Sequence, residues 1–142
     1  MAKAEFSAAD DVLASMDRLA EGVRRDVIRQ VVQAGADKYA EILKNEIQVR
    51  RHVVTGSMAN NVKAGKYYET VGGGYMYVYP QGGDNRGIDN AKKAFIINYG
   101  RGGRKTAKTG DRFITNLERT AEDPVQNAMA EKFEECIKQY TQ

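Results

Sequence analysis

The sequence contains few of the residue types that build metal sites, disulfides or reactive centres. Its 142 residues include one cysteine, one histidine, two prolines and no tryptophan. A single cysteine cannot form an internal disulfide, which favours a reducing compartment. One histidine and one cysteine cannot supply the three or four ligands of a zinc site. No calcium-binding loop motif is present either, so the sequence predicts no bound metal.

The sequence also argues against a nucleophilic enzyme. Cys136 lies beside acidic residues in a helical pattern, and negative neighbours raise the pKa of a thiol. A pairing of Cys136 with His52 is compatible with their separation, but a helix residue and a loop residue are the more ordinary interpretation. The glycine-rich segment 100–110 lacks the spacing of a P-loop, and Lys105 stands where a dinucleotide-binding motif needs its third glycine. We therefore predict no catalytic residues and no cofactor.

Long apolar runs are absent as well. Acidic and basic residues interrupt the first thirty positions, so we expect neither a signal peptide nor a membrane-spanning helix. Apolar residues make up 42% of the chain and charged residues 29%, which is typical of a soluble globular protein. The length predicts a single domain over residues 1–142 with one core.

Periodicity predicts a long helix near the start of the chain. Apolar residues recur every three or four positions over residues 10–48, as in a helix with one buried stripe. Glycine in a helix interior costs roughly 1 kcal/mol relative to alanine, so we expect a break or kink at Gly35. Residues 1–9 are expected to be flexible.

A β-hairpin is predicted next. Residues 50–65 indicate a loop with one short edge strand, and β-rich runs then occur at 66–71 and 75–79 around three glycines. In the second run Tyr75, Tyr77 and Tyr79 share one face, while Met76 and Val78 share the other. The Met76 and Val78 face should be core, and the tyrosine hydroxyls need water or a partner.

The second half of the chain ends in a helical pattern. Residues 94–99 could form a strand or a buried helical turn, and the pattern leaves this open. Helical spacing returns from residue 111, where Pro124 after Asp123 predicts two helical pieces that meet near Glu122. The expected class is α+β, with a long N-terminal helix, a small antiparallel sheet built on the tyrosine-rich hairpin, and a C-terminal helix.

Positive charge is concentrated in one region. Residues 86–112 hold eight basic and two acidic residues, although the whole chain carries only +3. Within this region, residues 100–110 have no apolar side chain larger than alanine, which predicts a mobile basic loop. The candidate partner-binding residues are Arg101, Arg104, Lys105, Lys108 and Arg112 from this region, and Tyr75, Tyr77 and Tyr79 from the hairpin.

These residues fit two kinds of partner. Basic side chains neutralise phosphates and tyrosines stack on bases, as in proteins that bind single-stranded nucleic acid. Tyrosine is equally enriched in protein–protein interfaces. The C-terminal helix is acidic on balance, so a basic loop on one copy could meet this helix on the next, an arrangement that makes rings.

Four short motifs occur in a characteristic order. They are Ala34-Gly35-Ala36, Val54-Thr55-Gly56-Ser57-Met58, Ile97-Asn98-Tyr99-Gly100 and Arg112-Phe113-Ile114. From about residue 11 to residue 140, the sequence resembles the head–tail joining or tail-completion family of tailed bacteriophages and prophages. The resemblance implies a non-enzymatic virion protein of the tail or neck, assembled in the host bacterial cytoplasm.

Such a protein is expected to form a homo-oligomeric ring of six that completes the tail tube and joins it to the head. The resemblance implies the tail-tube protein and the head-connector protein as partners, and leaves open a non-specific contact of the basic loop with DNA in the channel. The alternative function is a small, sequence-tolerant nucleic-acid-binding protein that uses the glycine-rich loop.

Overall fold

The protein combines a three-stranded antiparallel sheet with two long helices. The computed structural model describes residues 2–7, 17, 20–49, 56–101 and 108–141. The elements in chain order are β1 (Ala2–Ser7), α2 (Glu21–Val49), α3 (Ser57–Asn60), β2 (Val62–Thr70), β3 (Gly73–Pro80), α4 (Asn90–Tyr99), β4 (Gly100–Arg101), β5 (Lys108–Thr109) and α5 (Phe113–Thr141). This arrangement confirms the α+β class, with its long helix near the start, small antiparallel sheet and C-terminal helix.

The predicted hairpin is present and is longer than expected. Strands β2 and β3 pair through a two-residue turn at Val71 and Gly72, where Gly72 adopts a left-handed φ of 71°. A bulge interrupts the ladder between Ala64 and Tyr67. Strand β2 begins at Val62, so part of the segment predicted as a loop belongs to the sheet.

Strand β1 was not predicted from the sequence, and neither were the short elements α3, β4 and β5. Residues Ala2–Ser7 pair with the free edge of β3, from Ala2 opposite Val78 to Ser7 opposite Gly73. The expectation of a flexible segment therefore fails for these residues. The first long helix was predicted from residue 10. In the structure, Ala20 is not helical and α2 begins at Glu21. The remaining predicted helical positions, 10–16 and 18–19, lie outside the described residues.

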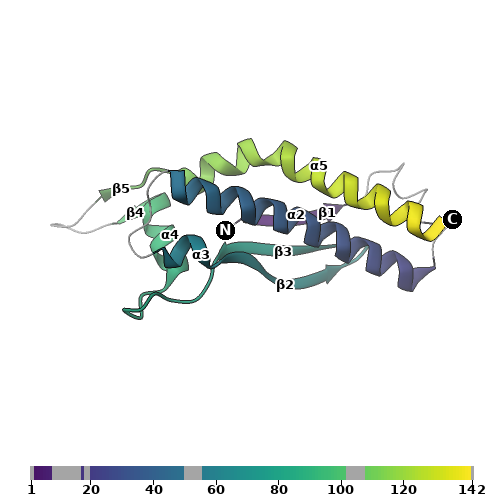
Figure 1. Ribbon diagram of the computed structural model, residues 1–142, viewed down its shortest axis with the longest axis horizontal. Coiled ribbons are helices and arrows are strands. Elements are labelled where there is room, and N and C mark those ends of the chain that lie inside the picture. The colour runs from purple at the N-terminus through teal and green to yellow at the C-terminus, as the bar shows by residue number, and fades with distance from the viewer. Residues whose placement is uncertain (1, 8–16, 18–19, 50–55, 102–107, 142) are drawn as a thin grey trace.

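Helix α2 packs on one face of the sheet and along α5, and α5 also contacts β1 (Figure 1). The apolar stripe of α2 packs against Ala4, Met76 and Val78 of the sheet, which are all buried. The predicted break at Gly35 is wrong, because α2 continues through this residue. A Cβ added at Gly35 would lie 2.7 Å from Met129 Cγ on α5. Glycine thus allows the two helices to approach closely.

Helix α5 is also continuous, so the predicted division near Glu122 is wrong. Pro124 lies inside the helix, although proline cannot donate the backbone hydrogen bond to the carbonyl four residues earlier. Ala121 before the proline and Met129 after it are both buried. The burial of residues before and after Pro124 outweighs the free energy lost with the missing backbone hydrogen bond, so α5 stays one continuous helix.

Segment 94–99 is helical, which answers the question that the sequence left open. Helix α4 begins at Asn90 after Asp89, whose side chain accepts a hydrogen bond of 3.1 Å from the Lys92 N–H. This cap satisfies one of the free donors at the helix start. Within the described residues, no helix is both long enough and apolar enough to cross a bilayer.

Candidate functional site

One face of the sheet is covered by α2 and the other carries four tyrosines. We call this second surface the tyrosine face; it comprises Tyr68, Tyr75, Tyr77 and Tyr79 with Lys3, Lys63 and Lys66. Met76 and Val78 point to α2 and are buried, whereas Tyr75, Tyr77 and Tyr79 are half-buried. The predicted division of β3 into a core face and a tyrosine face is therefore confirmed.

The rings of the tyrosine face pack on one another. Tyr68 and Tyr75, which are opposite in the register of β2 and β3, stack with centroids 5.1 Å apart and planes 17° apart. Tyr77 forms edge-to-face pairs with Tyr75 and with Tyr68, with ring centroids 5.6 Å and 6.3 Å apart. Offset-stacked and edge-to-face pairs are the favoured aromatic geometries, so these rings are ordered without a partner.

Lysines flank the rings. The Lys3 ammonium on β1 lies 4.5 Å from the centroid of Tyr75, and the Lys66 ammonium lies 5.8 Å from the centroid of Tyr68. Because β3 is the central strand, Tyr75 lies between Lys3 on one side and Tyr68 on the other. Lys63 pairs with Tyr79 in the register and points to the same side of the sheet. The ring of Tyr75 thus has little free face.

Tyr67 does not belong to this surface. The bulge before it reverses the alternation, so Tyr67 lies on the α2 side over Gly74, with the Arg29 guanidinium 5.6 Å from its ring. Gly65 lies within the bulge, and glycine inside a strand is a common sign of one, so the sequence held a signal for the face of Tyr67 that the alternation alone does not give.

The predicted basic residues lie elsewhere. Arg104 and Lys105 lie outside the described residues. Arg101 pairs with Lys108 in the two-stranded ribbon of β4 and β5, which extends from the end of the molecule near α4 (Figure 1). The Arg112 guanidinium lies 5.2 Å from the Tyr99 ring. The structure therefore places Arg101 and Lys108 in this ribbon, whereas Arg112 lies beside Tyr99, which lines one cavity with Tyr79 of the tyrosine face.

Beside this ribbon, buried polar side chains join α4 to its neighbours. We call residues 81–99 and 110–115 the α4 joint. The side-chain oxygen of Asn98, which is 1% exposed, accepts hydrogen bonds from the N–H groups of Ile114 (2.9 Å) and Thr115 (3.1 Å). Its amide donates to Thr115 Oγ1 at 3.0 Å. Asn98 thus caps α5 from another helix.

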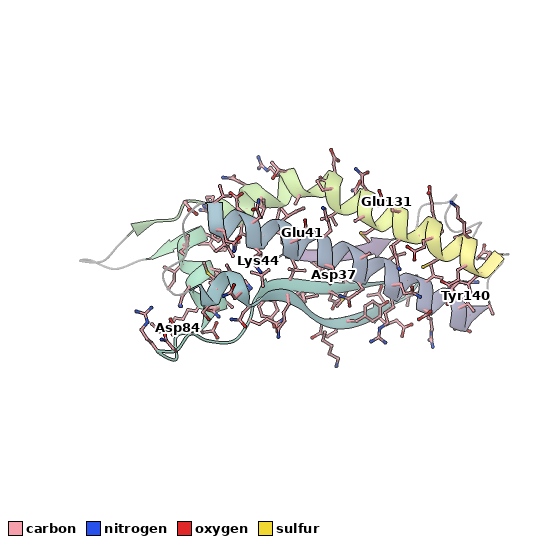
Figure 2. The ribbon with its side chains drawn as sticks, viewed as in Figure 1. Asp37, Glu41, Lys44, Asp84, Glu131 and Tyr140 are labelled. Carbon is pink, nitrogen blue, oxygen red and sulfur yellow. The ribbon has the colours of Figure 1, made fainter. Side chains whose placement is uncertain are left out.

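Asp84 organises the other side of the joint. Its side chain is fully buried and accepts hydrogen bonds from Lys93 Nζ at 2.6 Å and Arg86 at 3.2 Å. The N–H groups of Arg86 and Ile88 donate to the same carboxylate. The Lys93 bond, followed by the backbone donor of Ile88, holds the pKa of Asp84 far below its usual range. Figure 2 shows Asp84 within the loop that precedes α4.

A second exposed surface lies on α4. Phe95 is 60% exposed and Tyr99 is 47% exposed, with ring centroids 4.8 Å apart. Beside them is an apolar cavity of about 100 Å³, whose lining includes Leu43, Val78 and Ala94. We call Phe95, Tyr99 and Arg112 the α4 patch. Local helical periodicity predicts neither the exposure of the α4 patch nor the cavity beside it.

Cys136 does not resemble an activated nucleophile. It is 1% exposed, and its thiol donates to Gln30 Oε1 at 3.6 Å. Burial is the main cause that raises the pKa of this thiol, with the acidic neighbours a lesser one. His52 lies outside the described residues. Within the part of the chain that the structure describes, no three histidine, cysteine, aspartate or glutamate side chains gather as metal ligands.

Comparisons with protein families, with curated proteins and with solved structures found no match to this chain.

Proposed function

We propose that this protein is a structural component of a tailed bacteriophage or prophage. In this proposal it forms a homo-oligomeric ring at the head–tail junction, completes the tail tube and joins it to the head connector. The observation that carries the proposal is the tyrosine face, an ordered aromatic surface on a sheet whose other face is already covered. Tyrosines with an apolar body and an outward hydroxyl are typical of protein–protein interfaces.

The arrangement of the rings favours a protein partner over nucleic acid. Base stacking needs an open aromatic face. Tyr75 stacks on Tyr68 and is covered by the Lys3 ammonium, so its hydroxyl and edge are what it presents. A surface of edges and hydroxyls suits hydrogen bonds to another protein.

The motifs that carry the resemblance support a structural role. Ser57 accepts a hydrogen bond of 3.1 Å from Asn90 and donates one of 3.3 Å to the Gly83 carbonyl. Asn98 binds the first turn of α5 next to Phe113, which is fully buried. These motif residues therefore hold elements together, and this is the use expected of them in a scaffold.

Particle assembly tests the proposal. We expect that Tyr75→Glu with Tyr77→Glu leaves the isolated chain folded but stops joining of heads to tails, counted by electron microscopy of lysates. Lys44→Glu is the matched control, because Lys44 is exposed on α2 and belongs to neither exposed surface. Normal joining with the double tyrosine variant would refute the proposal, as would a gene position away from capsid and tail-tube genes.

The basic loop allows a second test. We expect that replacing Arg101, Arg104 and Lys105 by alanine blocks attachment of heads but leaves the melting temperature unchanged, because the two-residue strand that holds Arg101 contributes nothing to the core cluster. A lowered melting temperature would show that the loop belongs to the core.

A salt titration tests the nucleic-acid alternative. If the protein contacts phosphates, the logarithm of its affinity for single-stranded oligonucleotides should fall linearly with the logarithm of the salt concentration. Tight, salt-sensitive binding that is lost when Arg101, Arg104 and Lys105 are replaced by alanine would favour that function instead.

A further inference from the structure

We propose that the tyrosine face of one copy docks on the acidic outer face of α5 of a second copy. This inference rests on the proposed function and names the partner of the tyrosine face within the ring.

The α5 surface is strongly acidic where it faces solvent. Between Arg119 and Lys138, the exposed charged residues of α5 are Glu122, Asp123, Glu131, Glu134 and Glu135. The one basic residue in this stretch, Lys132, is half-buried and pairs with Glu135 at 3.2 Å. Figure 2 shows Glu131 on the side of α5 away from α2. We call these five carboxylates the acidic face.

The tyrosine face has the complementary chemistry. Lysines predominate among its charged residues, namely Lys3, Lys63 and Lys66, while the register of β1 also places Glu5 opposite Tyr75. The tyrosine hydroxyls beside them are hydrogen-bond donors, and ionised carboxylates accept bonds from both groups. Lysine stems and tyrosine rings also bury apolar area around each ion pair. The two surfaces thus match in charge and in donors and acceptors.

The two surfaces also match in length. Residues 75–79 of β3 span about 13 Å at the rise of a strand. The acidic face from Asp123 to Glu134 covers about three helical turns, or roughly 16 Å. Asp123 and Glu134 therefore lie on one side of the helix, and a row of carboxylates can lie along the row of tyrosines.

The fold prevents these surfaces from meeting within one molecule. Helix α2 covers the sheet face opposite the tyrosines and packs along α5 (Figure 1), and the carboxylates of the acidic face are exposed on α5, so the tyrosine face and the acidic face lie on different sides of the molecule. A contact between two different surfaces is heterologous, and each docked copy presents a new free surface of each kind. Repetition closes a ring when the rotation per copy divides a full turn.

A charge exchange tests this contact. The sheet variant carries Lys63→Glu and Lys66→Glu, and the helix variant carries Glu131→Lys and Glu134→Lys. We expect each variant alone to associate about tenfold or more weakly than the wild type by sedimentation velocity at low salt, because like charges then face each other. Melting temperatures should stay near the wild-type value, since all four side chains are exposed.

Mixing the two variants gives the decisive measurement. In the mixture, the Glu-bearing sheet of one variant faces the Lys-bearing helix of the other, and the remaining pair of surfaces is like the wild type. We therefore expect the mixture to recover wild-type association. Lys44→Glu serves as the control that leaves association unchanged.

Several outcomes would overturn the proposed contact. They are a wild-type chain that stays monomeric at millimolar concentration, single variants that associate like the wild type, and a mixture that fails to recover. If the single variants still form rings or join heads to tails, the proposed contact is refuted but the proposed function is not. Head–tail joining that proceeds without the protein would refute the proposed function itself.

Discussion

The core between the sheet and α2 and the α4 joint are held by different forces. Met76, Val78 and Leu43 fill the core with apolar volume. In the joint, by contrast, Asp84, Asn90 and Asn98 are buried polar side chains that bind backbone and side-chain groups from distant parts of the chain. Apolar packing gains free energy from burial of area, whereas a buried polar group stabilises only when its hydrogen bonds are made. The core should therefore respond to lost volume and the joint to lost partners.

The largest effect is expected in the core. Met76 is 4% exposed, and Met76→Ala should reduce the free energy of unfolding by about 2–5 kcal/mol through lost burial and a new cavity. Urea denaturation measures this change. Met76→Leu, which conserves volume, should cost less than about 1.5 kcal/mol. Equal losses for both variants would show that volume does not control this site.

A smaller loss is expected in the joint. Asn98→Ala leaves the buried N–H groups of Ile114 and Thr115 without their acceptor, which should cost about 1–3 kcal/mol. Faster hydrogen exchange confined to these two amides would locate the effect. Asn98→Asp keeps the acceptor at the helix start, where negative charge is favourable, so it should be milder. An alanine variant as stable as the wild type would contradict this role.

Asp84 should make the joint depend on pH. Its folded-state pKa lies far below the ordinary value, so its contribution is complete above that ordinary value of about 3.9 and declines as the pH falls toward the folded-state value. The difference in melting temperature between the wild type and Asp84→Asn should therefore be largest near neutral pH and narrow in acid. Lys93→Met should weaken this dependence of stability on pH. A difference in melting temperature between the wild type and Asp84→Asn that stays constant with pH would contradict the role of Asp84.

The smallest effect is expected outside both regions. Tyr68 is 42% exposed and stacks on Tyr75, and a cross-strand aromatic pair contributes roughly 0.2–1 kcal/mol. Tyr68→Ala should lower the unfolding free energy of the dilute chain by about this amount while it weakens self-association. A loss as large as that of Met76→Ala would place the tyrosine face within the core.

Periodicity predicted the elements in which buried and exposed side chains alternate at a regular interval along the chain. The alternation of Tyr75, Met76, Tyr77 and Val78 identified both faces of β3. The same reasoning failed at Gly35 and Pro124, because it weighed local backbone cost without the packing of α2 on α5. It also missed β1, since only the free edge of β3 gives Ala2–Ser7 a partner.

The candidate site was predicted in part. Tyr75, Tyr77 and Tyr79 lie together as expected, but Lys3, Lys63 and Lys66 were not among the predicted residues. Lys3 comes from β1, so its place over Tyr75 depends on a strand pairing that has no local signal. The joint residues Asp84 and Asn98 look like ordinary loop and helix residues until their partners are known.

The sequence by itself determined the class of the fold, the hairpin and the division of β3 into an apolar and an aromatic face, because each follows from a repeat of two or about four residues. Only the tertiary structure decided that α2 packs on both the sheet and α5, that Asn98 caps a helix sixteen residues away, and that lysines of two strands flank the tyrosines. Those features depend on contacts between distant segments, whose free energy no local pattern contains.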